Sequence, residues 1–290
     1  MSDAAPQTAP SDARPAGRIS ERFRDLSRNG ELGLVAYITA GDPSLEASEE
    51  IVLAAAEAGA DVVELGVPFS DPVADGPTIQ RASERALRSG TTLAGVLDLV
   101  RRLRERTQVP LVLFSYFNPI LQMGIEKFAD AAVSGGADGV LATDLTPEES
   151  ADYRAILRSR GLDTIFLAAP TSTDARLKLI AGVSSGFLYV ISRTGVTGAR
   201  ESLPEEVPAL VRRIRQCTAL PIAVGFGISL PTHVTVLGGI ADAAVVGSAI
   251  VAEIEKAGPA DAAAKVVGDL VGRLKHAARS GVSRRSADLG

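Results

Sequence analysis

Short runs of β-branched and other apolar residues alternate along the chain with longer stretches that have the spacing of amphipathic helices. The apolar runs predict eight buried strands, at residues 33–39, 61–66, 110–116, 139–142, 163–167, 186–191, 221–224 and 243–246. The intervening stretches predict eight helices, at residues 45–58, 92–107, 125–134, 148–160, 174–181, 205–217, 231–237 and 260–278. Four strands are entered through similar phrases, AGADVVEL, GGADGVLA, RGLDTIFL and GIADAAVV, in which a glycine follows the helix and a polar residue precedes the strand. The pattern therefore predicts eight successive β/α units.

Eight β/α units in a chain of this length fit a (β/α)8 TIM barrel, which typically takes about 250 residues. A doubly wound open sheet is the alternative, but the first strand-to-helix turn, residues 39–44, contains no GxGxxG. An amphipathic segment at residues 19–28 predicts an extra N-terminal helix that closes the bottom of the barrel. We therefore predict an α/β protein with one barrel domain over residues 19–279, a disordered N-terminal tail (1–18) and a flexible C-terminal tail (280–290).

Composition narrows the class of protein. The 290 residues are 46% hydrophobic, which is enough to bury a core, and no apolar run approaches the ~18 residues of a membrane span. One cysteine and two histidines exclude a disulfide scaffold, a cysteine-based zinc site and a histidine-rich metal centre. We expect His233 on a helix surface and His276 in solvent. The net charge of -5 argues against nucleic acid as a partner, so we expect a soluble cytoplasmic protein without a metal.

The second predicted strand carries an acidic residue at a buried position. In the run VVELG, residues 62–66, alternation directs Val63 and Leu65 towards the helices and Glu64 into the barrel. A buried carboxyl has a raised pKa and becomes a candidate acid-base group near neutral pH. A structural ion pair is the alternative, but no Lys or Arg lies in the core of any predicted strand. We therefore favour a catalytic role for Glu64.

The connection after this strand, residues 67–78, is long and contains three prolines and two aspartates, Asp71 and Asp75. Either aspartate alone is typical of a rigid surface turn. However, the loops after the strands form the active site of a TIM barrel. Two acids beside an inward-facing Glu64 therefore favour a site with several carboxyl groups.

Glycine-rich turns follow the last two predicted strands. Gly225-Phe226-Gly227 comes after the seventh strand and Gly247-Ser248 after the eighth. TIM barrels commonly bind phosphate through backbone N–H groups of these two loops, so both turns together favour a phosphate site over two ordinary tight turns. The long polar loop after the sixth strand, residues 192–203, has two glycines that could act as hinges, which favours a mobile lid. A merely disordered loop is an equally good interpretation of the same residues.

Aromatic side chains gather near the ends of the predicted strands. Each is typical of core packing when taken alone, but four together favour a pocket for a flat apolar group. They are Tyr37, Phe114, Tyr116 and Tyr189.

Four segments, ELGVPFSDPVADGPTIQ, SRTGVTGA, GFGIS and GSAIV, resemble the tryptophan synthase alpha chain family, and the resemblance extends from about residue 19 to residue 254. The resemblance implies a (β/α)8 barrel that cleaves indole-3-glycerol phosphate to indole and D-glyceraldehyde 3-phosphate. It implies no cofactor in this chain. The implied partner is a tryptophan synthase beta chain, which holds pyridoxal phosphate and receives indole through a tunnel in an α2β2 complex.

The resemblance also assigns site residues by position. It places the catalytic carboxyl groups at Glu64 and Asp75. The substrate-binding positions that it implies are Tyr37, Ile79, Phe114, Leu141, Tyr189, Arg193, Thr197 and Gly198. The phosphate-binding positions are Gly225, Phe226, Gly227, Gly247 and Ser248, and the partner-facing positions are Asp71, Asn118 and Asp144.

The implied reaction is a retro-aldol cleavage, which requires protonation of indole C3 so that the ring can accept electrons. A carboxyl group with a raised pKa at Glu64 can deliver this proton and then assist removal of the C3′ hydroxyl proton. An ionised Asp75 can accept the indole N–H and stabilise the positive charge that develops there. The two acids therefore need different environments, which the barrel interior and the loop supply.

One departure from the family pattern follows the fourth predicted strand, where residues 143–146 read TDLT instead of a PDLP-like run. The loss of both prolines supports a second hypothesis, a free-standing lyase that releases indole without a beta chain. A third hypothesis is a barrel that has lost catalysis and only binds a phosphorylated ligand or a partner. The presence of both Glu64 and Asp75 argues against it.

Overall fold

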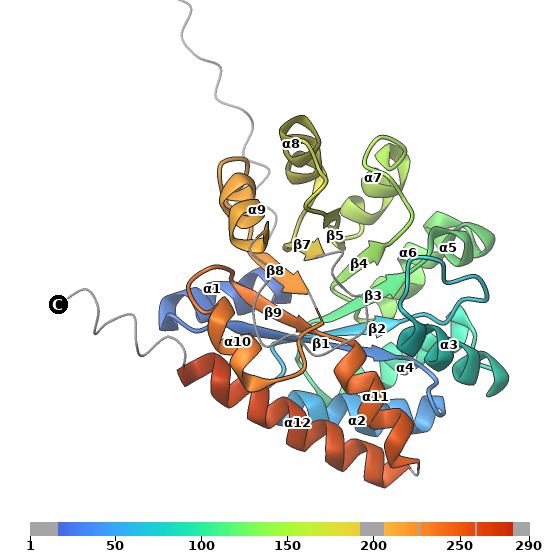
Figure 1. Ribbon diagram of the computed structural model, residues 1–290. Helices are drawn as coiled ribbons and strands as arrows, with labels where there is room; N and C mark the ends of the chain where they lie inside the picture. The colour runs from blue at the N-terminus through green and yellow to red at the C-terminus, as the bar shows by residue number, and fades with distance from the viewer. Residues whose placement is uncertain (1–16, 192–205, 226, 259, 281–290) are drawn as a thin grey trace, which may run out of the picture.

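The computed structural model describes residues 17–191, 206–225, 227–258 and 260–280 (Figure 1). The strands are β1 (Gly33–Thr39), β2 (Val62–Gly66), β3 (Leu111–Ser115), β4 (Gly139–Ala142), β5 (Asp163–Ile165), β6 (Leu167–Ala168), β7 (Leu188–Ile191), β8 (Ile222–Gly225) and β9 (Ala243–Val246). The helices are α1 (Arg18–Asn29), α2 (Leu45–Glu57), α3 (Pro77–Arg88), α4 (Leu93–Arg106), α5 (Phe117–Met123), α6 (Ile125–Gly135), α7 (Ala151–Ser159), α8 (Asp174–Val183), α9 (Glu206–Arg215), α10 (Pro231–Leu237), α11 (Ser248–Ala257) and α12 (Ala260–Ser280).

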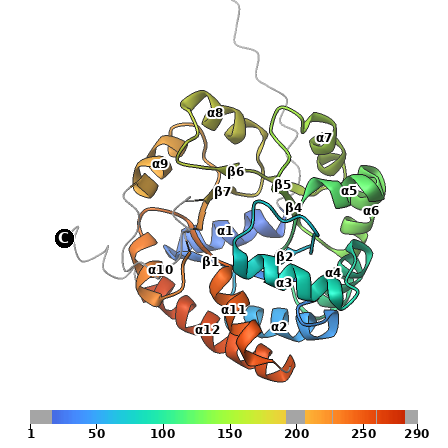
Figure 2. The same ribbon diagram turned by 45° about the vertical axis from the view of Figure 1, so that its right-hand side comes forward.

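The strands form one parallel sheet that curves into a nearly closed barrel. Their order is β5-β4-β3-β2-β1-β9-β8-β7-β6, so strands that are neighbours in sequence pair with each other, except β5 and β6 at the two ends of the order, and β1 pairs with β9. Figure 2 shows the helices as a ring around these strands. The predicted fifth strand is divided into β5 and β6 by Phe166. The prediction of a TIM barrel is confirmed, and the alternative of a doubly wound sheet is excluded because β1 lies between β2 and β9.

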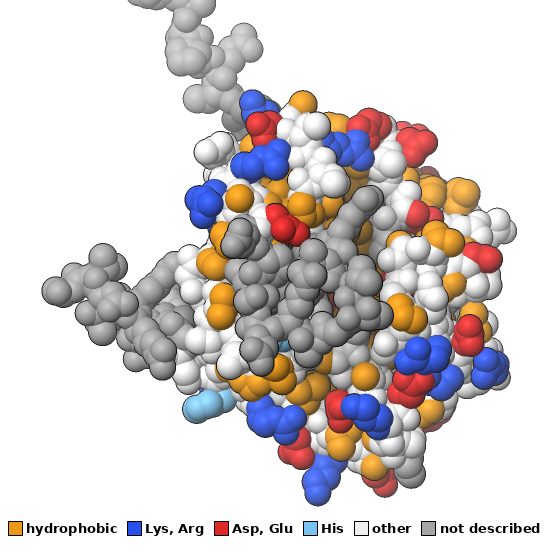
Figure 3. Space-filling model, viewed as in Figure 1, with side chains coloured by type: hydrophobic (Ala, Val, Ile, Leu, Met, Phe, Trp, Pro, Cys, Tyr) orange, Lys and Arg blue, Asp and Glu red, His pale blue; other side chains and the backbone are white. Residues whose placement is uncertain are grey.

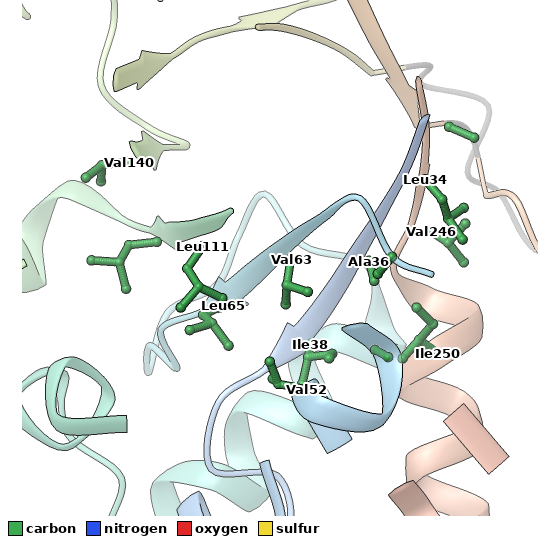
Figure 4. Packing of buried hydrophobic residues seen from close by; sticks show 14 of the residues in the cluster. Leu34, Ala36, Ile38, Val52, Val63, Leu65, Leu111, Val140, Val246 and Ile250 are labelled. Atoms are coloured by element: carbon green, nitrogen blue, oxygen red, sulfur yellow. The ribbon is translucent and has the colours of Figure 1, made fainter. Parts of the chain in front are cut away.

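Side chains that alternate along the strands form two separate parts of the core. Outward-facing residues such as Leu34, Ile38 and Leu65 belong to a cluster that includes Val52 of α2 and Ile250 of α11 (Figure 4). Inward-facing residues form a second cluster inside the barrel, which includes Val35, Val62, Val112, Leu141 and Ile165. The predicted alternation of β2 is therefore confirmed, with Val62 inside the barrel and Val63 and Leu65 outside it.

Helix α1 closes the bottom of the barrel, as predicted. Its apolar stripe of Ile19, Phe23 and Leu26 is buried and belongs to the inner cluster. The ring of Phe23 lies 5.6 Å from that of Phe187, which directly precedes β7. The polar face of this helix remains outside. The burial of its apolar face therefore follows from the amphipathic pattern of the sequence.

The aspartates of the strand-entry phrases connect neighbouring units at this same end. Asp61 accepts a hydrogen bond from the Leu34 N–H at 2.6 Å, and Asp138 accepts one from the Leu111 N–H at 2.8 Å. Each carboxylate therefore satisfies an amide at the start of the strand beside its own. Basic side chains complete both sites, and the buried Lys275 of α12 lies 2.8 Å from Asp61.

Three helices were not predicted as separate elements: α3, α5 and α11. The region expected to be a long loop up to residue 78 ends earlier, because Pro77 occupies the first turn of α3, where its missing N–H has no cost. This helix places Ile79 and Gln80 at the catalytic end of the barrel, so the omission matters for the site.

The described part of the chain contains no helix long and apolar enough to cross a membrane. Within the same residues, no group of three or more His, Cys, Asp and Glu side chains is arranged to hold a metal ion. On the face seen in Figure 3, basic and acidic side chains lie beside one another around the barrel. Ion pairs such as Arg81 with Glu255, at 2.9 Å, join side chains of opposite charge on the surface.

Candidate active site

Glu64 lies inside the barrel near the C-terminal end of β2. Its side chain is 0% exposed, and neither carboxyl oxygen has a hydrogen-bond partner among the described residues. Burial without a compensating cation favours the neutral form and raises the pKa of Glu64 to about 8. At neutral pH the group is therefore mostly protonated, and it can donate a proton to a bound molecule.

Asp75 lies in the turn between β2 and α3 and is less buried than Glu64. Burial raises its pKa to about 6, and a hydrogen bond from the Tyr116 hydroxyl, at 3.2 Å, opposes that rise by stabilising the carboxylate. Asp75 is therefore mostly ionised at neutral pH. The pKa of Glu64 is therefore higher than that of Asp75, so that at neutral pH one group is a proton donor and the other is a carboxylate, as cooperation between an acid and an anion requires.

Two further residues hold Asp75, and sequence reasoning did not assign this role to either. Tyr116 accepts a hydrogen bond from the Ala74 N–H at 2.9 Å while it donates to Asp75, so it fixes both the turn and the carboxylate. Gln80 donates from Nε2 to the backbone oxygen of Asp75 at 2.9 Å. The sequence indicates Tyr116 only as an aromatic residue near the end of a strand. Gln80 becomes a candidate for this role only if α3 is predicted.

Aromatic rings form the walls beside the two carboxyl groups. The ring of Phe114 contacts Tyr37 edge-on, with centroids 5.2 Å apart, and it lies 6.4 Å from Tyr189. Ile79 of α3 packs in the same small cluster as Tyr37 and Phe114. Leu141 is the register partner of Phe114 on β4. The structure thus brings these five predicted pocket residues together.

The phenols of Tyr37 and Tyr189 remain protonated in this environment. Burial is the main cause that raises the pKa of each, and the nearby carboxyl groups of Glu64 and Asp75 raise both further. Gly66 makes room for Tyr37, because a Cβ atom at position 66 would lie 2.1 Å from the Tyr37 hydroxyl. These phenols are therefore neutral donors close to the two acids.

The glycine-rich turns after β8 and β9 lie next to each other, because these strands pair. Gly247 is the N-cap residue of α11, and Ser248 is its first residue. The first amides of a helix have no partner within the helix, so they are available to an anion. Gly227 has φ +82°, a left-handed conformation that glycine adopts readily. Gly225 ends β8, and Phe226 lies outside the described residues.

The predicted lid residues Arg193, Thr197 and Gly198 also lie outside the described residues. The expectation that residues 192–203 form a lid therefore stays a prediction.

Asp71, Asn118 and Asp144 are all exposed at the catalytic end of the barrel, between β2 and α3, on the short helix α5 and after β4 respectively. Asp144 accepts a hydrogen bond from the Phe117 N–H at 2.7 Å, which ties the loop after β4 to the start of α5. Two exposed apolar side chains occur in the same segments, Val73 at 87% exposure and Leu121 at 53%.

The expectation that His233 lies on a helix surface is wrong. It is 3% exposed, because α10 turns this residue inward together with Val234 and Leu237. His276 is exposed, as expected.

A separate cavity of about 510 Å³ lies at the opposite end of the barrel, beside α1 and the loop before β8. Its lining includes Arg215 and Asp242, which form an ion pair with each other. It contains neither Glu64 nor Asp75 and is distant from the candidate site.

Comparison with known proteins gives a consistent assignment. The family model for the tryptophan synthase alpha chain matches residues 23–279. The tryptophan synthase alpha chain of Solibacter usitatus is 53% identical over 239 residues, which cover 82% of this chain and 90% of that relative. The structure of the alpha subunit from Legionella pneumophila is 36% identical with a TM-score of 0.84, covering 91% of this chain and 98% of that one. A chain of the tryptophan synthase complex from Pyrococcus furiosus is 38% identical with a TM-score of 0.78, covering 84% and 97% respectively.

Proposed function

The chain belongs to the tryptophan synthase alpha chain family and is a lyase of the aldolase half-reaction, and we propose that Glu64 and Asp75 are its catalytic residues. The observation that carries this proposal is the contrast between the buried, unpartnered carboxyl group of Glu64 and the carboxyl group of Asp75, which Tyr116 holds. These surroundings raise the pKa of Glu64 to about 8 and that of Asp75 to about 6. At a pH between these two pKa values, the site holds one proton donor, Glu64, and one carboxylate, Asp75. This combination suits cleavage of indole-3-glycerol phosphate to indole and D-glyceraldehyde 3-phosphate.

Neutral Glu64 begins the reaction by giving its proton to indole C3, which makes the ring cationic and able to accept an electron pair. The Asp75 carboxylate accepts the indole N–H and stabilises this positive charge. Glu64, now ionised, takes the proton of the C3′ hydroxyl group. The electrons of that O–H bond form the aldehyde carbonyl, and the electrons of the C3–C3′ bond restore the aromatic ring. The products are indole and the aldehyde, and Glu64 is protonated again.

The walls of the site bind the two ends of this substrate. Tyr37, Phe114 and Tyr189 offer ring edges and faces to the flat indole group, and Ile79 and Leu141 complete an apolar pocket. The amides of Gly225, Phe226 and Gly227 and those of Gly247 and Ser248 bind the phosphate group. Arg193, Thr197 and Gly198, which lie outside the described residues, complete the substrate-binding set of this proposal.

The catalytic roles are tested by the isosteric substitution Glu64→Gln, with release of indole from indole-3-glycerol phosphate as the assay. Loss of the transferable proton lowers the rate by about a thousand-fold or more, because the acid acts directly in the bond-breaking steps. Asp71→Asn is the matched control: it removes an exposed acid of the loop that holds Asp75 and leaves the rate of the isolated chain unchanged. Substantial activity in folded Glu64→Gln would contradict the mechanism.

The partner in this proposal is a tryptophan synthase beta chain, in an α2β2 complex located in the cytoplasm. Its support is the likeness to the Pyrococcus furiosus complex and the exposed residues Asp71, Asn118 and Asp144 at the catalytic end. Pyridoxal phosphate belongs to the partner, and this chain needs no cofactor for the chemistry above. Co-purification with a beta chain and a higher rate of indole formation in its presence are the expected results. A rate that does not respond to a bound or added beta chain would favour the free-standing lyase.

A further inference from the structure

A buried histidine lies directly behind the glycine-rich turn that follows β8. His233 is the third residue of α10 and is 3% exposed. Its Nδ1 accepts a hydrogen bond from the Ser229 N–H at 3.3 Å. Nδ1 is therefore the imidazole atom that accepts in this contact.

The turn is anchored on both sides of this contact. Ile228 is 1% exposed and belongs to the same buried cluster as Val234 and Leu237 of α10. Beyond Ser229, the N–H of His233 itself donates to the Leu230 oxygen at 3.0 Å. The main chain from residue 228 to residue 233 is therefore fixed by one apolar side chain and two hydrogen bonds.

The amides just before these anchors are available to a ligand. Gly227 is exposed and has a left-handed φ of +82°. Within the described ranges, no residue accepts a hydrogen bond from the N–H of Gly227 or of Ile228. Unpaired amides at a turn bind an anion well only if the turn already has the bound conformation, because ordering it during binding weakens the affinity.

We propose that His233 is a positioning residue for phosphate recognition. Its Nδ1 holds the Ser229 N–H inward, so that the turn offers the amides of Gly227 and Ile228 to the phosphate group of the substrate. The histidine does not touch the substrate and acts only through the turn. This inference rests on the phosphate site proposed above.

Two substitutions separate the acceptor from the rest of the side chain. His233→Leu keeps an apolar group of similar size and removes the acceptor. His233→Asn places Oδ1 close to the position of Nδ1 and keeps it. The loss of one hydrogen bond in His233→Leu raises its KM for indole-3-glycerol phosphate about five-fold and leaves its kcat within about two-fold of that of the unaltered chain. Both kcat and KM of His233→Asn stay within about two-fold of those of the unaltered chain. The inhibition constant of inorganic phosphate rises by the same factor as KM in His233→Leu, and it does not change in His233→Asn.

A substrate without the phosphate group, indole-3-glycerol, separates this role from a general structural one. His233→Leu and the unaltered chain cleave indole-3-glycerol with equal kcat/KM, because this substrate has no phosphate group to bind at the turn. Thermal unfolding of each variant checks the fold. If His233→Leu does not fold, His233→Ala removes the same acceptor without placing a branched side chain in the core.

The outcomes distinguish this inference from the site on which it depends. An unaltered chain that is not inhibited by inorganic phosphate and does not prefer the phosphorylated substrate would show that the phosphate site is wrong. A chain with both properties, combined with an unchanged KM in His233→Leu, would overturn only the role of His233. Equal losses on both substrates, or failure of His233→Asn to retain the KM, would also overturn it.

Discussion

Glu64 lies on β2 and Asp75 in the turn that follows this strand, and the two acids differ mainly in what surrounds their oxygens. Glu64 has no partner among the described residues, whereas Asp75 accepts a hydrogen bond from Tyr116. Sequence alternation was enough to predict that Glu64 points into the barrel. The contact between Tyr116 and Asp75 could not be predicted, because it joins residues 41 positions apart whose approach depends on the path of the β2–α3 turn.

The pH dependence of kcat/KM follows from these two environments. Activity requires ionised Asp75 and protonated Glu64, so it rises with pH through about 6 and falls through about 8, with a maximum near neutral pH. Initial rates of indole formation at low substrate concentration, measured from pH 5 to pH 9, report both limbs. A profile that keeps rising above pH 8 would contradict the assignment of Glu64 as the acid.

Tyr116→Phe tests how Asp75 is kept ionised. The hydroxyl group of Tyr116 lowers the pKa of Asp75, so its removal moves the acid limb to higher pH and leaves the basic limb, due to Glu64, in place. We expect kcat/KM to fall roughly five-fold at pH 6 and less at pH 7.5, in line with the loss of a hydrogen bond to a charged group. The same pH titration of the rate measures this shift.

Tyr153→Phe is the control for that experiment. Tyr153 is also a buried tyrosine, but its hydroxyl group has no hydrogen-bond partner among the described residues and it lies on α7. Its substitution leaves both limbs unchanged. An acid limb that moves equally in the two variants would show that the effect does not come from contact with Asp75.

At the scale of elements, the sequence predicted the strands, with β5 and β6 as a single one, and missed three helices. Strands in a parallel barrel are buried on both faces and therefore read as apolar runs. Helix α3 buries only Ala82, Ser83 and Ala86, and α5 buries only Ile120, so neither produces a strong apolar stripe. Helix α11 follows β9 so closely that its Ile250 and Val251 merge with the apolar run of the strand. The sequence predicted His233 on the surface of its helix, whereas the side chain is buried and accepts a hydrogen bond from the Ser229 N–H. Hydrophobic periodicity does not reveal such a partner for a polar side chain.

The aspartates of the repeated entry phrases stabilise the junctions between units. Asp138 accepts the Leu111 N–H and lies 2.8 Å from Arg104, so Asp138→Ala leaves a buried amide and a half-buried cation without this partner. We expect the free energy of unfolding to fall by about 3 kcal/mol, as when one partner of a buried ion pair is removed. Urea denaturation measures the change.

Glu84→Ala is the matched control, because it removes an acid from the exposed ion pair with Arg88. The median contribution of such pairs is about 0–1 kcal/mol, so the control changes stability far less. The activity of folded Asp138→Ala stays near normal, since Asp138 precedes β4 and lies at the end of the barrel opposite Glu64. Equal destabilisation in the two variants would contradict the proposed junction.

For the whole molecule, the two ends of the barrel separate stability from chemistry. The bottom contains α1, the strand-entry aspartates and the buried pair of Lys275 with Asp61. The catalytic end contains the unpaired carboxyl group of Glu64 and the exposed residues of the connecting loops. Residues that hold the fold together thus lie at one end of the barrel and the candidate catalytic residues at the other, which is the usual distribution in TIM barrels.

This separation predicts that association with a beta chain can be altered without harm to the isolated chain. Val73 is 87% exposed on the loop that holds Asp75, so Val73→Asp leaves the rate and stability of the isolated chain unchanged. If the loop docks on the partner, a buried charge weakens association at least ten-fold, as measured by the beta-chain concentration needed to stimulate indole formation. Leu179→Asp is the control, because Leu179 is 38% exposed on α8, away from these loops. Equal weakening in both variants, or none in Val73→Asp, would place the beta chain on a different face of the barrel.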